Sequence, residues 1–309
     1  MFSERMDTGM NSVVRGNKKV ISGQVFDSIN IMIMIVLCCI TLFPFIHVLA
    51  VSLNEGTDAA RGGIWFWPRS WTLDNFKKVL SDSSIVPAYL ITITRTLLGT
   101  LLSVFFTAAF AYGITKRDLI GRNLYLTIGV ITMFFSGGII PTYLLMHWLH
   151  LTNTFWVYIF PTMFSFWNVL IFQGFFKEIP NELSESAQLD GANELLIFCK
   201  IIVPVSTPAL ACIALFCGVG HWNAWYDAYI YNNNALQTLQ CLLMRLVKQN
   251  TTTTGNINLS EVLGQPNMTI TMESVRSATI IVAVGPIIMI YPFLQKFFTK
   301  GLILGSVKG

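Results

Sequence analysis

The sequence predicts an all-α membrane protein that crosses the bilayer several times, and three observations support this fold class. The 309 residues are 53% hydrophobic and only 12% charged, whereas soluble domains carry about 25% charged residues. The apolar residues gather in blocks of about 20, the length that a helix needs to cross a hydrocarbon core. A backbone in lipid must satisfy its own hydrogen bonds, so each block is expected to be a helix.

The pattern gives six spans, at residues 28–52, 86–114, 124–147, 155–176, 207–231 and 276–298. The first block is longer than the 7–15 apolar residues of a cleaved signal peptide, so it is interpreted as a span. Pro44, Pro141 and Pro161 lie within or near spans and are expected to kink them. Residues 28–298 therefore form one six-helix domain, between an N-terminal segment, 1–27, and a tail, 299–309.

Basic residues predict the orientation of the spans. They occur in the N-terminal segment (Arg5, Arg15, Lys18 and Lys19), in the turn between spans two and three (Lys116, Arg117 and Arg122) and in the tail (Lys296, Lys300 and Lys308). Six spans place all three groups on one side, which the positive-inside rule assigns to the cytoplasm. Both termini are then cytoplasmic, in a bacterial inner membrane, and the long segments 53–85 and 232–275 lie outside.

Composition also excludes several functions. The formal net charge is only +4 and no dense Lys/Arg run occurs, so a nucleic-acid partner is not expected. The six cysteines show no C-x-x-C spacing, and buried hydrophobes are expected instead of a metal site. No G-x-x-x-x-G-K-[ST] sequence occurs, so the chain is not expected to bind ATP or to need another cofactor. We find no catalytic cluster of acids, histidines or cysteines.

A polar, acid-rich run interrupts the apolar pattern before span five. "PNELSESAQL" can form a short helix with Asn181 as a possible cap, with Ala187 and Leu189 buried and Glu185 outward. Gly191 should break this helix, because glycine tolerates a positive φ. A second short helix then runs to Pro204, and Pro208 opens the span. From the pattern alone, these helices could be an ordinary amphipathic surface loop.

The same run resembles the "EAA" signature of type I ABC importer permeases. The matching positions are Glu185, Ser186, Ala187, Asp190, Gly191, Ala192, Phe198, Ile201, Pro204 and Pro208. The departure is Ser186, which replaces the first alanine of the signature. Other segments, "MFFSGGIIPTYLL", "GHWNAWYDAYIY" and "QKFFTKGLILGSVKG", resemble the carbohydrate-uptake class, in its complex polysaccharide and oligosaccharide subgroup, similar to the maltose-transporter G-type permease.

The resemblance implies a type I ABC importer permease fold, with cytoplasmic coupling helices at about 177–206 that dock on an ATPase. It also implies the partners: a second permease subunit in a heterodimer, two ATPase subunits that bind the ATP, an external solute-binding protein, membrane lipid and an oligosaccharide substrate. The tail either reaches the ATPase interface or is a frayed terminus.

Aromatic and amide residues suggest a substrate pathway, because sugars present apolar faces to aromatic rings and hydroxyl edges to amides. The candidates are Arg95, Trp167, Asn168, Trp222, Asn223 and Trp225. For Trp167 and Asn168, helix–helix packing is an equal alternative. Arg95 is an ionisable residue within a span, which suggests a pathway or subunit-interface role, but it could also snorkel to the outer surface.

Two other classes of protein fit the sequence less well. A secondary sugar transporter or facilitator predicts internal repeats and gives no reason for the Asp-Gly-Ala loop. A membrane enzyme predicts a catalytic constellation at a membrane face. The sequence therefore favours the permease subunit of an ATP-driven, binding-protein-dependent oligosaccharide importer, not an enzyme.

Overall fold

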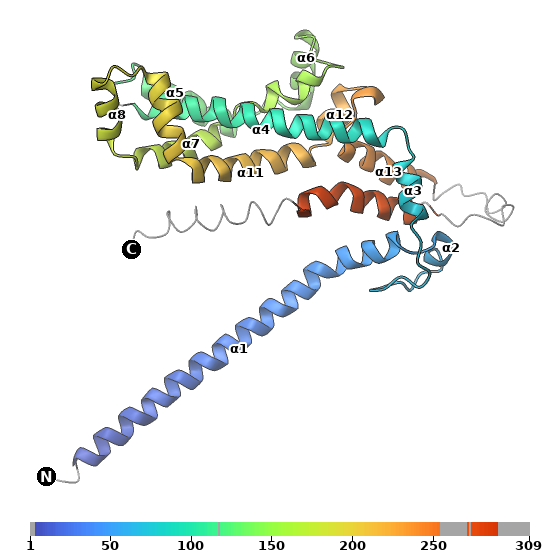
Figure 1. Ribbon diagram of the computed structural model, residues 1–309, viewed down its shortest axis with the longest axis horizontal. Coiled ribbons are helices and arrows are strands. Elements are labelled where there is room, and N and C mark those ends of the chain that lie inside the picture. Colours follow the sequence, from blue (N-terminus) through green and yellow to red (C-terminus); the bar gives the residue numbers. More distant parts are fainter. Residues whose placement is uncertain (1–3, 117, 254–270, 272, 290–309) are drawn as a thin grey trace. The chain divides into compact units, whose positions relative to one another are not determined.

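The computed structural model describes residues 4–116, 118–253, 271 and 273–289, and every regular element within these ranges is a helix (Figure 1). The described backbone also contains an isolated antiparallel bridge between Asn54 and Trp71. The all-α prediction is confirmed for this part of the chain. The chain divides into two compact units. The first lies within Met1–Asn75 and Met268–Ala278, and the second lies within Phe76–Asn267 and Thr279–Gly309.

The first unit is built on helix α1, Glu4–Ser52. Its apolar part, Val25–Ser52, is long enough to cross a membrane and is almost wholly exposed within the chain. An apolar segment of this length and extent is typical of a helix that crosses a membrane. The end of the helix agrees with the predicted span, whereas its start does not, because residues 4–27 continue the same helix.

A folded segment follows α1 and contains helix α2, Gly56–Ala59. The Asn54 side chain organises it, since Oδ1 accepts the backbone N–H groups of Arg69 and Ser70 at 2.8 Å each. Asn75 Nδ2 donates to the carbonyl oxygens of Ser52 and Asn54. Helix α3, Asp74–Leu80, comes next, and Thr72 Oγ1 accepts the Asp74 N–H near its start.

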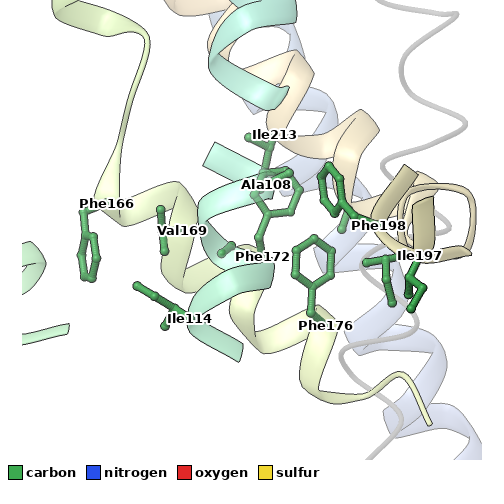
Figure 2. Packing of buried hydrophobic residues seen from close by; sticks show 12 residues of the cluster. Ala108, Ile114, Phe166, Val169, Phe172, Phe176, Ile197, Phe198 and Ile213 are labelled. Carbon is green, nitrogen blue, oxygen red and sulfur yellow. The ribbon is translucent and has the colours of Figure 1, made fainter. Parts of the chain in front are cut away.

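The second unit is centred on three helices, α4 (Ile85–Thr115), α7 (Phe166–Lys177) and α11 (Thr207–Asn223). Helix α4 lies alongside α11 and also packs on α7 (Figure 1). Their shared core contains Ala108, Ala111 and Ile114 from α4, Phe166, Val169, Phe172 and Phe176 from α7, and Ala209 and Ile213 from α11 (Figure 2).

Three of the predicted spans are interrupted in the structure. Span 124–147 is divided into α5 (Arg122–Phe134) and α6 (Ile139–Trp148), which meet at 117°. The break contains Ser136 and two glycines, and Gly138 has φ of +83°, which a continuing helix excludes.

The other two bends have similar local causes. Span 155–176 begins as 3₁₀ turns η1 (Phe155–Tyr158) and η2 (Phe160–Thr162), with Pro161 inside the second, and meets α7 at 51°. Span 207–231 is divided into α11 and α12 (Tyr226–Tyr231), because the backbone at Ala224 is extended.

The described residues contain two unbroken helices that could cross a membrane, or five if each bent pair is one span. Of the predicted sixth span, residues 276–289 belong to a helix over 273–289 and residues 290–298 lie outside the described part. The count of six remains a prediction. Within its described residues, the predicted outer segment 232–275 contains the turn η4 (Asn234–Leu236) and helix α13 (Leu239–Thr253).

Candidate functional site

The candidate site is the loop between α7 and α11, and the predicted pair of short helices is present in it. The first is α8, Asn181–Leu189. The second begins as α9 (Glu194–Ile197), passes through one π-helical turn, η3 (Phe198–Ile202), and ends as α10 (Val203–Val205). In the second unit, α8 lies at the opposite end of α4 and α11 from α12 and α13 (Figure 1).

Gly191 ends the first helix through a Schellman cap. Its φ is +82°, its N–H donates to the Gln188 carbonyl at 3.0 Å, and the Ala192 N–H donates to the Ala187 carbonyl at 2.9 Å. These two bonds satisfy carbonyls that a helix end would otherwise leave unpaired. The Asp-Gly-Ala part of the signature is therefore a helix stop whose geometry requires glycine.

The helix starts differ from the prediction in one respect. Pro180, and not Asn181, occupies the N-cap position of α8, and its side chain makes no capping bond. Asn193 caps the second helix instead, because its Oδ1 accepts the Leu196 N–H at 2.8 Å. Asparagine is a strong N-cap residue, and of the two asparagines Asn193 occupies that position.

The surface of the loop corrects a second expectation. Leu189, predicted to be buried, is 90% exposed, and Leu195 is 64% exposed. Ala187 is half-buried against the core as predicted, while Glu185, Ser186 and Asp190 are exposed. A hollow of about 390 Å³ lies beside them, lined by Ala187, Asp190, Gly191, Ala192, Leu196, Ile197, Lys200 and Ile201. Exposed leucines beside a hollow are typical of a surface that docks a protein partner.

Glu194 links both halves of the loop to α4. It accepts a hydrogen bond from Tyr112 Oη at 2.6 Å and pairs with Lys116 Nζ at 2.9 Å. Gln188 Nε2 of α8 donates to the same carboxylate at 2.8 Å. The Tyr112 hydrogen bond is the main reason why the pKa of Glu194 is lowered, and Lys116 lowers it further. Sequence reasoning missed these residues, since their pairing depends on tertiary contacts 78 and 82 positions apart.

Apolar side chains anchor the second helix to the core. Phe198 is 2% exposed and lies beside Phe172 and Phe176 of α7, with Ile197 next to it (Figure 2). The Tyr112 ring lies 5.5 Å from the Phe198 ring between centroids. The phenylalanine of the signature thus connects the loop to α7 and α4 at once.

Two prolines connect the loop to α11. Pro204 lies in α10 and Pro208 in the first turn of α11, where a missing N–H costs nothing. The segments before and after this junction, Glu194–Val205 and Thr207–Asn223, meet at 85°. The loop is therefore a bent element that continues directly into a long helix.

The predicted pathway residues are divided between two places. On α7, Trp167 is 63% exposed, whereas Asn168 is buried and donates to Cys217 Sγ of α11 at 3.5 Å. At the end of α11, Trp222 is buried with its Nε1 bonded to the Ala283 carbonyl, Asn223 is exposed, and Trp225 packs on Tyr226 and Tyr229. Their pathway role stays a prediction.

Arg95 does not extend to the surface of the chain. Its side chain is 1% exposed and pairs with Asp227 of α12. The snorkelling alternative therefore does not describe this residue in the structure.

Bent apolar helices around a central core, with a capped two-helix loop at one end, are the features that the sequence analysis expects of a transporter's membrane subunit. A solved structure has this fold: the chain matches a bacterial ABC transporter involved in the import of the acidic polysaccharide alginate, with a TM-score of 0.81 and 27% identity. The match covers 90% of this chain and 98% of that one. No family model matches the chain.

Curated relatives identify the family. The polygalacturonan/rhamnogalacturonan transport system permease protein YtcP of Bacillus subtilis is 38% identical over 288 residues, 93% of this chain and 99% of that protein. Protein LplC of the same organism is 37% identical over 289 residues, 93% and 96% of the two chains. The trehalose/maltose transport system permease protein MalG of Thermococcus litoralis is 29% identical over 284 residues, 89% and 94% of the two chains. The chain belongs to the family of sugar ABC transporter permeases.

Membership confirms the resemblance drawn from the sequence. The protein is an integral membrane subunit of an ABC importer, a transport component and not an enzyme. Permeases of such importers act in general with a partner permease, an ATPase and a binding protein.

Proposed function

We propose that this permease imports oligosaccharides or polysaccharide fragments, driven by a separate ATPase that binds the loop at 177–206. The substrate class is supported by relatives whose names specify polygalacturonan and rhamnogalacturonan, and by the alginate importer. In the proposed assembly the chain pairs with a second permease, two ATPase subunits bind the ATP, and a binding protein delivers the sugar from outside.

The observation that carries the coupling proposal is the Gly191 cap. It turns the chain so that Leu189 and Asp190 face outward beside the hollow, while Ala192 and Phe198 face the core. A coupling element must be exposed on one side and firmly held on the other, so that motion of the ATPase is not lost. Glu194 and Phe198 supply that hold.

The ATPase side of the membrane follows from the charge distribution. We propose that the loop, the N-terminal segment 1–27 and the tail 299–309 are cytoplasmic, because short basic segments remain inside. Residues 53–85 and 232–275 are then available to the external binding protein. Trp167, Asn168, Trp222, Asn223 and Trp225 are the proposed contacts along the sugar pathway.

Substitution of the cap tests the coupling proposal. Gly191→Pro is incompatible with a φ of +82° and removes the N–H that bonds Gln188, and Asp190→Arg reverses a charge beside the hollow. In proteoliposomes that contain the complete importer, we expect normal insertion, continued ATP hydrolysis and uptake reduced at least about tenfold.

The matched control is Asp118→Arg, the same charge change at an exposed position in the turn between α4 and α5. It should leave uptake within about twofold of the original rate. Normal uptake by both loop variants would show that the ATPase couples elsewhere.

A further inference from the structure

A second polar cluster lies at the other end of α4 from Glu194, and it is built around a buried cation. Arg95 Nη1 lies 3.0 Å from Asp227 Oδ1, and Nη2 contacts Oδ2 of the same carboxylate. The Tyr158 ring faces the guanidinium, with Cζ 4.6 Å from the ring centroid. A two-point contact of this kind is the strong and directional form of an ion pair.

The same guanidinium also completes the backbone of a broken helix. Helix α11 ends at Asn223, and Arg95 Nη1 donates to the carbonyl of the next residue, Ala224, at 3.2 Å. Asp227 lies in the first turn of α12, where its Oδ1 accepts the Ala228 N–H at 2.8 Å. Irregular backbone at membrane depth persists only where other groups satisfy it. Arg95 and Asp227 therefore hold both sides of the break between α11 and α12.

Close packing continues along α4 from this cluster. Gly99, one turn further along, is buried, and a Cβ atom there would overlap the His221 ring of α11. At the far end of α4, Tyr112 and Lys116 contact Glu194 in the loop. Helix α4 is thus joined to one continuous segment, Glu194 to Asp227, by a polar contact at each end.

We infer that Arg95 and Asp227 are positioning residues that make α4, α11 and α12 move as one body during transport. This inference rests on the proposed coupling through the loop. Motion imposed on Glu194 reaches Trp222 along α11 itself. Beyond the break at Ala224, the contact of Arg95 with Asp227 ties α12 to α4, so that α12 follows the same motion. The inference also gives Arg95 a role other than direct contact with the sugar, because its charge is compensated within the chain.

A double-mutant cycle tests the inference. Arg95→Gln, Asp227→Asn and the double variant would be prepared in the complete importer and normalised for membrane abundance. Each single change leaves a buried charge without its partner, which is more disruptive than removal of both. We expect each single variant to lower the maximal uptake rate at least about tenfold, with KM unchanged, and the double variant to be no slower than the slower single.

Uptake would be measured with unsaturated digalacturonate as the probe, and the thermal unfolding midpoint of the sugar-free complex would be measured in parallel. The midpoint should show the same non-additivity. Thr96→Val is the control, because its hydroxyl bonds only its own helix at Thr92, and it should leave uptake within about twofold.

Three outcomes have distinct meanings. Multiplicative losses, about 100-fold in the double variant, would overturn the inference. A raised KM in Arg95→Gln alone would show that Arg95 contacts the sugar, and would also overturn it. If the unmodified importer does not take up the probe, the substrate proposal fails. The unfolding midpoints then still test the inference: additive changes in the midpoint would reject the coupling of Arg95 with Asp227, and non-additive changes would support it.

Discussion

At the scale of single residues, Gly191 shows why the signature of this loop contains a glycine. Its φ of +82° costs an L-residue about 1–2 kcal/mol, although a Cβ atom there would meet no neighbour within 4 Å. The requirement comes from the backbone and not from packing. Ala187 and Ala192 are different, because both line the hollow next to the core, where a larger side chain would fill it.

Glu194 provides a prediction on pH at this scale. Its pKa lies below the usual value of 4.5, first because Tyr112 donates to it and then because of Lys116. A carboxyl group whose pKa is lowered by folding stabilises the folded state at pH values above its pKa in the unfolded chain. This stabilisation is lost as the pH falls through the pKa in the folded state. The side chain is 56% exposed, so solvent screening limits the contribution to below about 1 kcal/mol.

We therefore expect Glu194→Gln to lower the thermal unfolding midpoint slightly at pH 7, and the difference from the original protein to shrink as the pH falls below 4.5. Midpoints of the detergent-solubilised protein across this range would measure the difference. Glu182→Gln, at an exposed carboxylate of α8, is the control and should change neither value. A difference that grows toward acidic pH would contradict the assigned ion pair.

At the scale of elements, the contact between α4 and α11 depends on small side chains. The buried face of α4 carries Thr92, Gly99, Ser103, Thr107 and Ala111. Small residues let helices approach closely in a membrane, where packing and not the hydrophobic effect holds helices together. The approach is closest at Gly99, which faces the His221 ring.

Gly99→Ala should separate these helices, because the added methyl group would overlap His221. We expect a loss of stability of about 1–3 kcal/mol, measured as a lower unfolding midpoint of the purified permease. Gly113→Ala lies on the same helix with no atom within 4 Å of the added carbon, and should be neutral or slightly stabilising. Equal effects of the two substitutions would contradict the close contact.

At the scale of the whole molecule, a native cysteine offers a test of orientation. Cys199 is an exposed free thiol within η3 of the proposed coupling loop. In a variant that retains only this cysteine, we expect a membrane-impermeant maleimide to label inverted vesicles and not intact cells. The reason is that the loop lies on the cytoplasmic side in the proposed topology.

Asp82→Cys in the same background is the control, since residue 82 lies in the proposed outer segment and should be labelled from outside the cell. Labelling of Cys199 in intact cells would place the loop outside and reject both the topology and the coupling to a cytoplasmic ATPase.

The sequence by itself determined the helical class, the membrane location and the place of the two-helix loop before α11. Each depends on local properties: runs of apolar residues, a low charge content, and a glycine that the chain needs at position 191. The exposure of Leu189 was predicted wrongly, because amphipathic spacing identifies the faces of a helix but not how much of each face a neighbour covers.

Tertiary structure alone decided the rest. At the break at 224–225, a contact distant in sequence satisfies the exposed backbone, because Arg95 donates to the Ala224 carbonyl. Glu194 meets Tyr112, and Arg95 meets Asp227, because α4 runs beside the whole of the segment that contains the loop and α11. Composition could mark Arg95 as unusual in a membrane, but its partner is 132 positions away, and only the packing of the helices brings the two together.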